Sequence, residues 1–281
     1  MKRVGKAKAK RGRAFIGTSG YVYKHWTGGV FYPEKLPLSQ WLDYYAQQFD
    51  SVELNGTFYK LPGAHVFQNW YDSSPRGFSF FVKGSRFVTH FKHLKDPEEP
   101  LERFFGSVHP LKEKLAGVLW QLPGRYQVNV ERVAEFLKVF RQISDTRLVM
   151  EFRHPSWFIP EITAALKDYD AVYCRADAPD FYLGLDLPHT ANYAYFRRHG
   201  AGAPTMYSGN YPDEALAKDA AEMKSLMSRG MDVFCYFNND IGGHAPRNAA
   251  TLEQMLSTKP QAHLTTSPQR HREHRGHREM K

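Results

Sequence analysis

The feature that most constrains the fold is a regular alternation of short apolar runs with segments of helical periodicity. Eight runs rich in Val, Phe, Tyr and Leu predict strands at residues 13–20, 50–55, 77–84, 115–123, 147–154, 171–177, 192–200 and 232–240. Strands that alternate with helices are typical of a parallel sheet with right-handed crossovers. Runs such as VFCYF are apolar on both faces and fit a sheet covered by helices.

The segments between these runs carry helix signals. Ser39 is a candidate N-cap for a helix over 39–49, Asn129 for one over 129–140, and Gly230 is suited to end a helix over 212–230. Further helices are expected near 64–72, 98–106, 160–168 and 246–257. The segment after the sixth strand leaves little room for a full helix.

The main alternative to a barrel is an open, doubly wound sheet. That fold would place a glycine-rich G-x-G-x-x-G turn after its first strand, and GTSGYVYKHW does not match. A length of 281 residues suits one α/β barrel, and eight strands are the number that closes it. We therefore predict one TIM-type (β/α)8 barrel over residues 14–260, with irregular or missing helices allowed.

The formal net charge of +9 is concentrated at the two ends of the chain. Residues 1–13 carry seven Lys or Arg and no acid, and residues 268–281 carry five against two acids, so residues 14–267 have 26 basic and 27 acidic side chains. We predict a disordered basic tail over 1–13 and a disordered His/Arg-rich tail over 261–281. Such tails allow weak, nonspecific nucleic-acid binding, whereas the neutral body argues against a large nucleic-acid surface.

The sequence also bears on the compartment. The basic start has no apolar stretch behind it, so no secretory signal peptide is expected. No run approaches the roughly 18 apolar residues that a membrane span needs, so no membrane partner is predicted. Cys174 and Cys235 lie in apolar runs and are interpreted as buried, unpaired residues. These features favour the cytoplasm.

Every predicted strand ends in polar residues. In TIM-type barrels the chemistry lies at the carboxyl ends of the strands, so these side chains should meet at one mouth. The ends carry Thr18, Ser19, Glu53, Asn55, Lys83, Gln121, Glu151, Arg153, Asp177, Arg197, His199, Asn238 and Asn239. Because alternate side chains share a face, Glu53 with Asn55, Glu151 with Arg153, and Arg197 with His199 should point the same way. Structural ion pairs such as Glu53 with Lys83 remain the alternative for any single pair.

These strand ends give a set of candidate site residues. Acid or base chemistry is assigned to Glu53, Lys83, Glu151, Asp177 and His199. Ligand binding is assigned to Asn55, Arg86, His90, Gln121, Arg153, Arg197, Asn238, Asn239, Tyr23 and Trp157. The arginines suit an anionic group, and the aromatic residues suit stacking on a sugar or a base. A Schiff base at Lys83 is allowed, although nothing in the sequence selects it.

A metal site is the alternative use of the same residues. Glu151, Asp177 and His199, with Glu53 opposite, offer donors that suit Mg²⁺, Mn²⁺ or Zn²⁺. The basic residues that meet at the same mouth, which forms a polar cup, would repel a cation. We therefore predict no metal ligands and leave the cofactor undetermined.

Seven ordered motifs carry a family resemblance over about residues 14–257. They are GTSGYVYKHW with FYP, VELNGTFY with LP, FVKGSRFVTH, QLP, EFRHPSW, RRHG, and YFNND with GHAPRNA. In order and spacing the chain resembles the YecE-like family, also called domain of unknown function 72. The resemblance implies a TIM-type barrel and no established reaction. It places family motif positions on the strand-end residues Glu53, Asn55, Lys83, Gln121, Glu151, Arg153, Arg197, His199, Asn238 and Asn239 and also on Arg86, His90, His154 and His244.

Two positions depart from the family pattern. Arg198 stands where the family usually has an apolar residue, which predicts an extra charge on the helix-facing side of the strand. Val88 stands where the family usually has isoleucine, a change of little consequence.

Three functions are compatible with these features. The first is an enzyme that acts on a small anionic ligand, sugar-like or nucleotide-like, by acid and base chemistry at the mouth of the barrel. The second is a nucleic-acid-associated barrel that processes or senses an end of the polymer. The third is a small-molecule sensor without catalysis.

Overall fold

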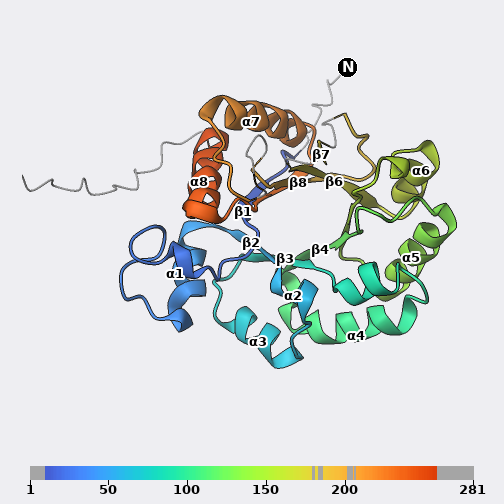
Figure 1. Ribbon diagram of the computed structural model, residues 1–281, viewed down its shortest axis with the longest axis horizontal. Helices are drawn as coiled ribbons and strands as arrows, with labels where there is room; N and C mark the ends of the chain where they lie inside the picture. The colour runs from blue at the N-terminus through green and yellow to red at the C-terminus, as the bar shows by residue number, and fades with distance from the viewer. Residues whose placement is uncertain (1–9, 179–180, 183–185, 201–204, 206, 258–281) are drawn as a thin grey trace, which may run out of the picture.

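The chain folds into a barrel of parallel strands, as the alternation predicted. The structure is a computed structural model that describes residues 10–178, 181–182, 186–200, 205 and 207–257. The parallel strands are β1 (Ala14–Thr18), β2 (Ser51–Leu54), β3 (Ser79–Lys83), β4 (Leu115–Gln121), β5 (Arg147–Glu151), β6 (Ala171–Ala178), β8 (Tyr193–Arg198) and β9 (Asp232–Phe237). They pair in the order β1-β9-β8-β6-β5-β4-β3-β2, and Figure 1 shows them inside a ring of helices.

The barrel closes at a seam between β1 and β2. A single parallel bridge joins Ser19 to Glu53 there, in place of a regular ladder. The hydroxyl of Tyr45 fills the gap, because it accepts a hydrogen bond from Thr18 N (2.8 Å) and donates one to Ser51 O (3.1 Å). The seam therefore ends at two residues of the predicted mouth.

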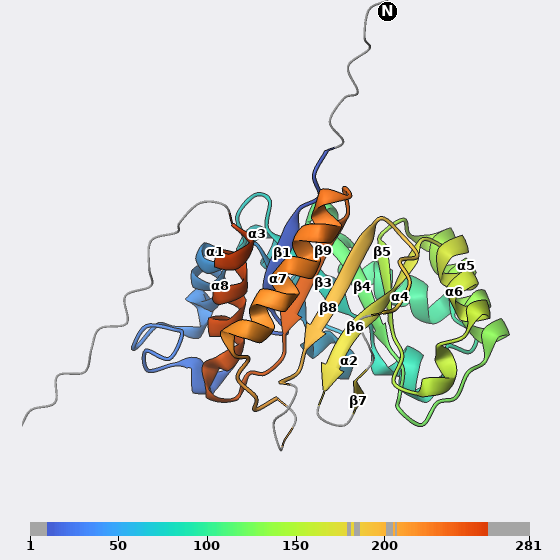
Figure 2. The ribbon, with the colours of Figure 1, turned by 90° about the horizontal axis from the view of Figure 1, so that it is seen from above.

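Helices cover the outside of the barrel (Figure 1). They are α1 (Trp41–Gln48), α3 (Ala64–Asp72), α4 (Glu98–Val108), α5 (Val130–Ile143), α6 (Pro160–Asp168), α7 (Asp213–Ser228) and α8 (His244–Leu256). The short helix α2 (Gly56–Tyr59) lies instead at one end of the barrel (Figure 2). Shorter helical turns are η1 (Lys24–Trp26), η2 (Leu38–Gln40), η3 (Phe87–Phe91), η4 (His109–Lys114), η5 (Pro155–Trp157) and η6 (Ile241–Gly243).

The predicted helix ends are mostly confirmed. Asn129 caps α5 by accepting a hydrogen bond from Arg132 N (2.8 Å), and Gly230 follows α7 with a φ of +86°. The prediction for Ser39 is wrong: it lies inside η2, and Gln40 occupies the N-cap position of α1 without a side-chain hydrogen bond. Ser39 is part of the 3₁₀ turn that precedes α1, so it does not occupy the N-cap position of that helix.

Alternate residues of the strands form two cores. The residues that point into the barrel include Phe81, Val149, Tyr195 and Tyr236. The residues that point outward pack against the helices and form the larger core. Both cysteines are buried and unpaired, as predicted.

The connection after β6 differs from the regular pattern. β7 (Phe181–Tyr182) pairs antiparallel with β6 and was not predicted, and the described residues between β6 and β8 contain no helix, as expected. Figure 2 shows α2 and β7 at the end of the barrel toward which the arrows of β6 and β8 point, which is the predicted mouth.

The predicted tails fall largely outside the described residues, which begin at 10 and end at 257. Gly12 N donates to Met227 O (2.9 Å) and Arg13 N to Asp232 Oδ1 (3.0 Å). The packed part of the chain therefore starts before residue 14. Among the described residues, no helix is long and apolar enough to span a bilayer.

Candidate functional site

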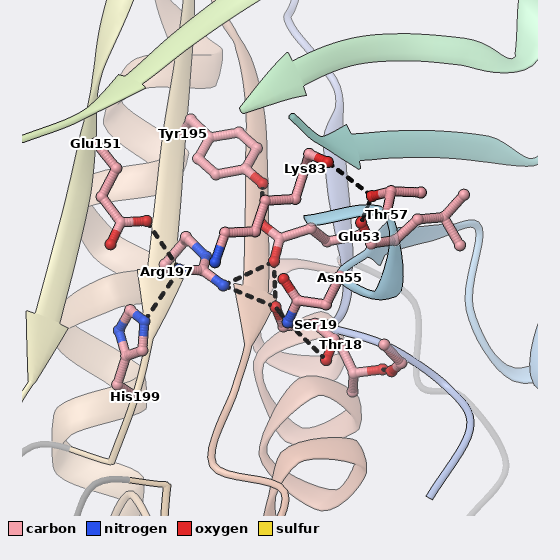
Figure 3. A network of polar contacts seen from close by, with 12 residues as sticks. Thr18, Ser19, Glu53, Asn55, Thr57, Lys83, Glu151, Tyr195, Arg197 and His199 are labelled. Carbon is pink, nitrogen blue, oxygen red and sulfur yellow. Dashed lines mark hydrogen bonds and ion pairs between the residues drawn. The ribbon is translucent and has the colours of Figure 1, made fainter. Parts of the chain in front are cut away.

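Arg197 of β8 is the centre of a buried ionic network at the carboxyl ends of the strands (Figure 3). Its Nη2 donates to Glu53 Oε1 and its Nη1 donates to Glu151 Oε2, each at 2.8 Å. Both glutamates are fully buried and Arg197 is 1% exposed. One guanidinium group therefore links strands β2 and β5 across the barrel, as the shared interior face of these residues predicted.

Glu53 lies at the seam and accepts further hydrogen bonds. The hydroxyls of Ser19 and Tyr195 both donate to its carboxylate. Asn55 Nδ2 donates to Ser19 Oγ (2.7 Å), which places Asn55 beside the same group. The Glu53 carboxylate therefore has no oxygen without a partner.

Glu151 is held by two arginines. Arg153 Nε and Nη2 lie 2.7 and 2.6 Å from Glu151 Oε1, and Arg197 binds the other oxygen. Burial alone would raise the pKa of Glu151, but the two guanidinium charges hold that pKa well below its ordinary value. Glu151 is therefore ionised and a poor proton acceptor.

Lys83 ends β3 and differs from its charged neighbours. Its Nζ lies 4.2 Å from the centroid of the Phe58 ring, and among the described residues it has no hydrogen bond and no carboxylate oxygen within 4.0 Å. The Thr57 hydroxyl lies within hydrogen-bond distance of two carbonyl oxygens, Lys83 O (2.6 Å) and Leu54 O (2.8 Å), which holds α2 and Phe58 beside β3. Burial, followed by the charge of Arg197, lowers the pKa of Lys83 to about 7.

A π-helical turn, η3, follows Lys83 and brings two more predicted residues to the rim. Burial and the charge of Lys83 lower the pKa of His90 to about 4. The Arg86 guanidinium lies 5.6 Å from the Tyr59 ring centroid and 5.5 Å from that of Phe91, and all three residues are exposed. Turns of this kind are rare and are frequent at functional sites.

His199 follows Arg197 on the same side of the chain, two residues nearer the mouth. Its Nε2 accepts a hydrogen bond from Arg197 Nη1 (3.1 Å), so the proton is assigned to Nδ1, which is buried without a partner among the described residues. Burial and the neighbouring Arg197 charge hold the pKa of His199 well below its ordinary value. The imidazole is therefore neutral and offers a donor rather than a charge.

Three other predicted residues also belong to the mouth. Gln121 and Asn238 are buried and lie on the interior faces of β4 and of the segment after β9. The Tyr23 hydroxyl donates to Ser19 O (2.6 Å). Burial is the main cause that raises the pKa of Tyr23, and the charges of Asp240 and Glu53 add to it. Tyr23 therefore lies close to the carboxylates.

The predicted position of Asp177 at the mouth is wrong, because its side chain faces the helices and not the barrel interior. The interior residues of β6 are Val172, Cys174 and Ala176, so Asp177 points outward. It accepts hydrogen bonds from the Tyr211 hydroxyl (2.9 Å) and from His199 N (2.8 Å). Its role is to hold the backbone that carries His199.

Arg198 faces the same outer layer, as its departure from the family pattern predicted. Its Nε and Nη2 donate to the two carboxylate oxygens of Asp219 on α7, at 2.7 and 2.6 Å. The extra charge is thus neutralised by a bidentate pair between strand and helix.

Trp157 and Asn239, predicted to bind the ligand, are fully buried and bonded to other parts of the protein. Trp157 is fully buried, stacks on Phe152 and donates its Nε1 hydrogen to Tyr126 O (2.6 Å). Asn239 Nδ2 donates to Gly209 O (2.6 Å) and to Asn248 Oδ1 (2.8 Å). Both side chains hold loops against the barrel.

The metal alternative is not supported by the arrangement of donors. In the part of the chain that the structure describes, no three His, Cys, Asp or Glu side chains are grouped so that they could hold a metal ion. Asp177 lies outside the cup, and the oxygens of Glu53 and Glu151 are already bound by other side chains.

One site residue was overlooked in the sequence. Tyr195 binds the Glu53 carboxylate and is fully buried, yet its strand reads as plain core. The alternation of side chains could have identified it, because Tyr195 shares one face of the chain with Arg197 and His199, which were predicted to point into the barrel.

Known proteins are similar to this chain in sequence. The family model described as "Protein of unknown function DUF72" matches residues 15–273. The UPF0759 protein YunF of Bacillus subtilis (strain 168) is 27% identical over 253 residues, which are 80% of this chain and 89% of YunF. The UPF0759 protein YecE of Escherichia coli (strain K12) is 26% identical over 118 residues, 42% of this chain and 43% of YecE.

Two crystal structures agree with the fold. A DUF72 family protein from Thermotoga maritima MSB8 matches with a TM-score of 0.75 and 34% identity, over 87% of this chain and 99% of that one. A DUF72 family protein from Enterococcus faecalis V583 matches with a TM-score of 0.74 and 21% identity, over 88% and 97% of the two chains. The chain therefore belongs to the DUF72 family, the YecE-like family that its strand-end motifs resemble.

Proposed function

We propose that the protein is a cytoplasmic enzyme that binds a small anionic ligand, sugar-like or nucleotide-like, at the carboxyl-terminal mouth of the barrel. The uncharged amine of Lys83 serves as its general base. The observation that carries this proposal is the lack of an ion pair for Lys83 beside two glutamates that arginines already occupy. General bases work best when their pKa lies near the working pH, and the pKa of Lys83 is about 7.

The buried network has a supporting role in this proposal. Glu53, Glu151 and Arg197 are 0 to 1% exposed and bind one another, so they fix the electrostatic field and the strand ends rather than contact the ligand. Their charges, with that of Arg153, cancel. Arg86 at the exposed rim then adds a positive charge that is not part of this balance and suits an anionic group.

A ligand screen tests this proposal. Phosphorylated sugars, nucleotides and organic acids are tested by thermal shift against the wild-type protein and against Arg86→Ala, with Arg132→Ala on α5 as the matched surface control. A ligand that stabilises the wild type and the control but not Arg86→Ala supports the site. Hits that bind all three equally would place the ligand elsewhere. Binding without turnover would favour the sensor alternative.

Nucleic-acid association is a second candidate, favoured by one observation. A cavity of about 590 Å³ opens at the amino ends of the strands, opposite the mouth. Its lining includes Lys10, Arg11, Arg13, Arg147 and Arg229 against the single acid Asp232. Binding of a single-stranded oligonucleotide that weakens with salt and with Arg13→Gln/Arg229→Gln, but not with Arg103→Gln on α4, would support it. Equal binding of the oligonucleotide by all variants would show that this cavity does not bind nucleic acid.

A further inference from the structure

We propose that Lys83 acts as a nucleophile and forms a protonated imine with a small aldehyde or ketone that also carries a carboxylate or a phosphate. This inference rests on the proposed function, because it uses the same mouth. It adds a covalent step and names the class of substrate.

The acids next to Lys83 are already bound by other side chains. Glu53 Oε1 accepts from Arg197 and Ser19, and its Oε2 accepts from Tyr195. Glu151 Oε1 binds Arg153 and its Oε2 binds Arg197. Each carboxylate oxygen of the network already accepts a hydrogen bond from another side chain, and none lies within 4.0 Å of Lys83 Nζ, so the amine has no fixed counter-ion among the described residues.

The amine of Lys83 also lies in a position that suits a nucleophile. Lys83 is 8% exposed, ends a barrel strand and lies against the face of Phe58, so its nitrogen is desolvated but not sealed from the mouth. An amine that titrates near neutrality is about half uncharged at pH 7, whereas an ordinary lysine is uncharged to less than roughly one part in a thousand. Only the uncharged form has the lone pair that attacks a carbonyl carbon.

The surroundings of Lys83 also suit the positive charge of the product. The carboxylates of Glu53 and Glu151 act on Lys83 through their charges and favour its protonated form, while Arg197 opposes it. A protonated imine keeps the positive charge of the lysine on the same nitrogen, so the two carboxylates stabilise it in the same way. Arg86 at the rim, whose charge is not part of the balanced network, supplies the attraction for the anionic group of the substrate.

The step balances without an oxidant or a cofactor. The lone pair of uncharged Nζ forms a bond to the carbonyl carbon, and one Nζ proton passes to the carbonyl oxygen to give a carbinolamine. The carbinolamine hydroxyl then takes a proton from solvent and leaves as water, while the nitrogen lone pair forms the C=N bond. One amine, one carbonyl group and one proton thus yield one protonated imine and one water.

Reductive trapping tests the proposal on the full chain. The protein is incubated with pyruvate, which carries a carboxylate, or with glyceraldehyde 3-phosphate, which carries a phosphate, and sodium borohydride is added. Acetone serves as the uncharged carbonyl. Lys83→Arg removes the nucleophile but keeps a cation, and Lys92→Arg is the matched control on a nearby lysine. Intact mass and peptide mapping report the adduct, and circular dichroism confirms the fold of each variant.

We expect an adduct that needs the reductant, maps to Lys83, and forms roughly a hundredfold faster than at surface lysines at pH 7. It should persist in Lys92→Arg, vanish in Lys83→Arg and be weak with acetone. The stronger of the two anionic probes then identifies the carboxylate or the phosphate class. The absence of a Lys83 adduct with every probe would overturn the imine. Calorimetry of the same ligands separates the failure of the imine from the failure of the proposed function. A ligand that binds but is not trapped by borohydride overturns the imine and leaves Lys83 as a general base. If no ligand binds and none is trapped, both proposals are overturned.

Discussion

The amine of Lys83 lies 4.2 Å from the ring centroid of Phe58, at the end of a strand whose charged neighbours are paired with one another. A lysine in this position is expected to lose its proton near neutral pH, because burial penalises the charged form and no counter-ion restores it. The proposed roles of Lys83 as general base and nucleophile both depend on this position of the amine.

A stability measurement follows from the Lys83 pKa. The unfolded chain keeps the lysine protonated up to about pH 10.5, whereas the folded chain releases the proton near pH 7, so the unfolded state binds more protons between these values. The free energy of unfolding of the wild type should therefore rise with pH across this window, relative to Lys83→Met. Lys83→Met should be the more stable protein at pH 7, by up to about 4 kcal/mol, and the gap should shrink to about 1 kcal/mol near pH 10.

Urea titrations of both proteins at the two pH values give this difference. A Lys83→Met protein that is less stable than the wild type by the same amount at both pH values would mean that Lys83 is charged and paired in the folded state.

The buried network predicts a large cost for loss of its central cation. Arg197→Met leaves the carboxylates of Glu53 and Glu151 buried without their shared partner. Removal of one member of a buried ion pair costs about 3–5 kcal/mol, so the free energy of unfolding should fall by that amount at pH 7. Arg132→Met on α5 is the surface control. A loss no larger than that of the control would show that the network does not hold the strand ends together.

Asp177 distinguishes the cup from the outer layer. Asp177→Asn should leave binding of any ligand at the mouth unchanged, because its side chain faces the helices and bonds to Tyr211 and His199 N. It should lower the free energy of unfolding by about 1–2 kcal/mol, since the amide is the weaker acceptor. Calorimetric titration with a ligand from the screen compares it with Glu151→Gln, which should weaken binding by loosening Arg153. Equal loss in both variants would return Asp177 to the site.

The pair of Arg198 with Asp219 predicts a strong coupling. Arg198→Leu restores the apolar character that the family usually has there but leaves Asp219 buried without its bidentate partner, at a cost of about 3–5 kcal/mol. The double variant Arg198→Leu/Asp219→Leu should recover most of this loss, because an apolar pair replaces the ionic one. Denaturant unfolding of the four proteins measures the coupling, and additive losses would contradict it.

Much of the fold could be predicted from local patterns. Seven of the eight parallel strands lie within their predicted runs, because apolar runs bounded by turn residues are a local signal, and β6 extends one residue beyond its run, to Ala178. Asn129 and Gly230 mark the ends of their helices through local backbone chemistry. Strand β7 escaped prediction because a two-residue strand has no periodicity of its own.

The candidate site could be predicted only in part. Alternation placed Glu53, Glu151 and Arg197 on the interior, and the structure confirms it. The run that holds Asp177 has an apolar face of Val172, Cys174 and Ala176, and Asp177 shares the opposite face with Arg175, so alternation was a signal for its outward position that the prediction overlooked. Which charged side chains form ion pairs also depends on how the strands meet in the folded barrel, so the sequence alone does not determine it. The sequence allowed Glu53 with Lys83, whereas the structure gives both glutamates to arginines and leaves the lysine without one.

The pKa of Lys83 in the folded protein is the most direct test. Lysine labelled with ¹³C at Cε is followed by NMR through a pH titration, and the Lys83→Arg variant assigns the resonance. We expect the Lys83 signal to titrate near pH 7, several units below an ordinary lysine. A Lys83 signal that titrates with the bulk of the lysines near pH 10.5 would contradict both the general base and the nucleophile.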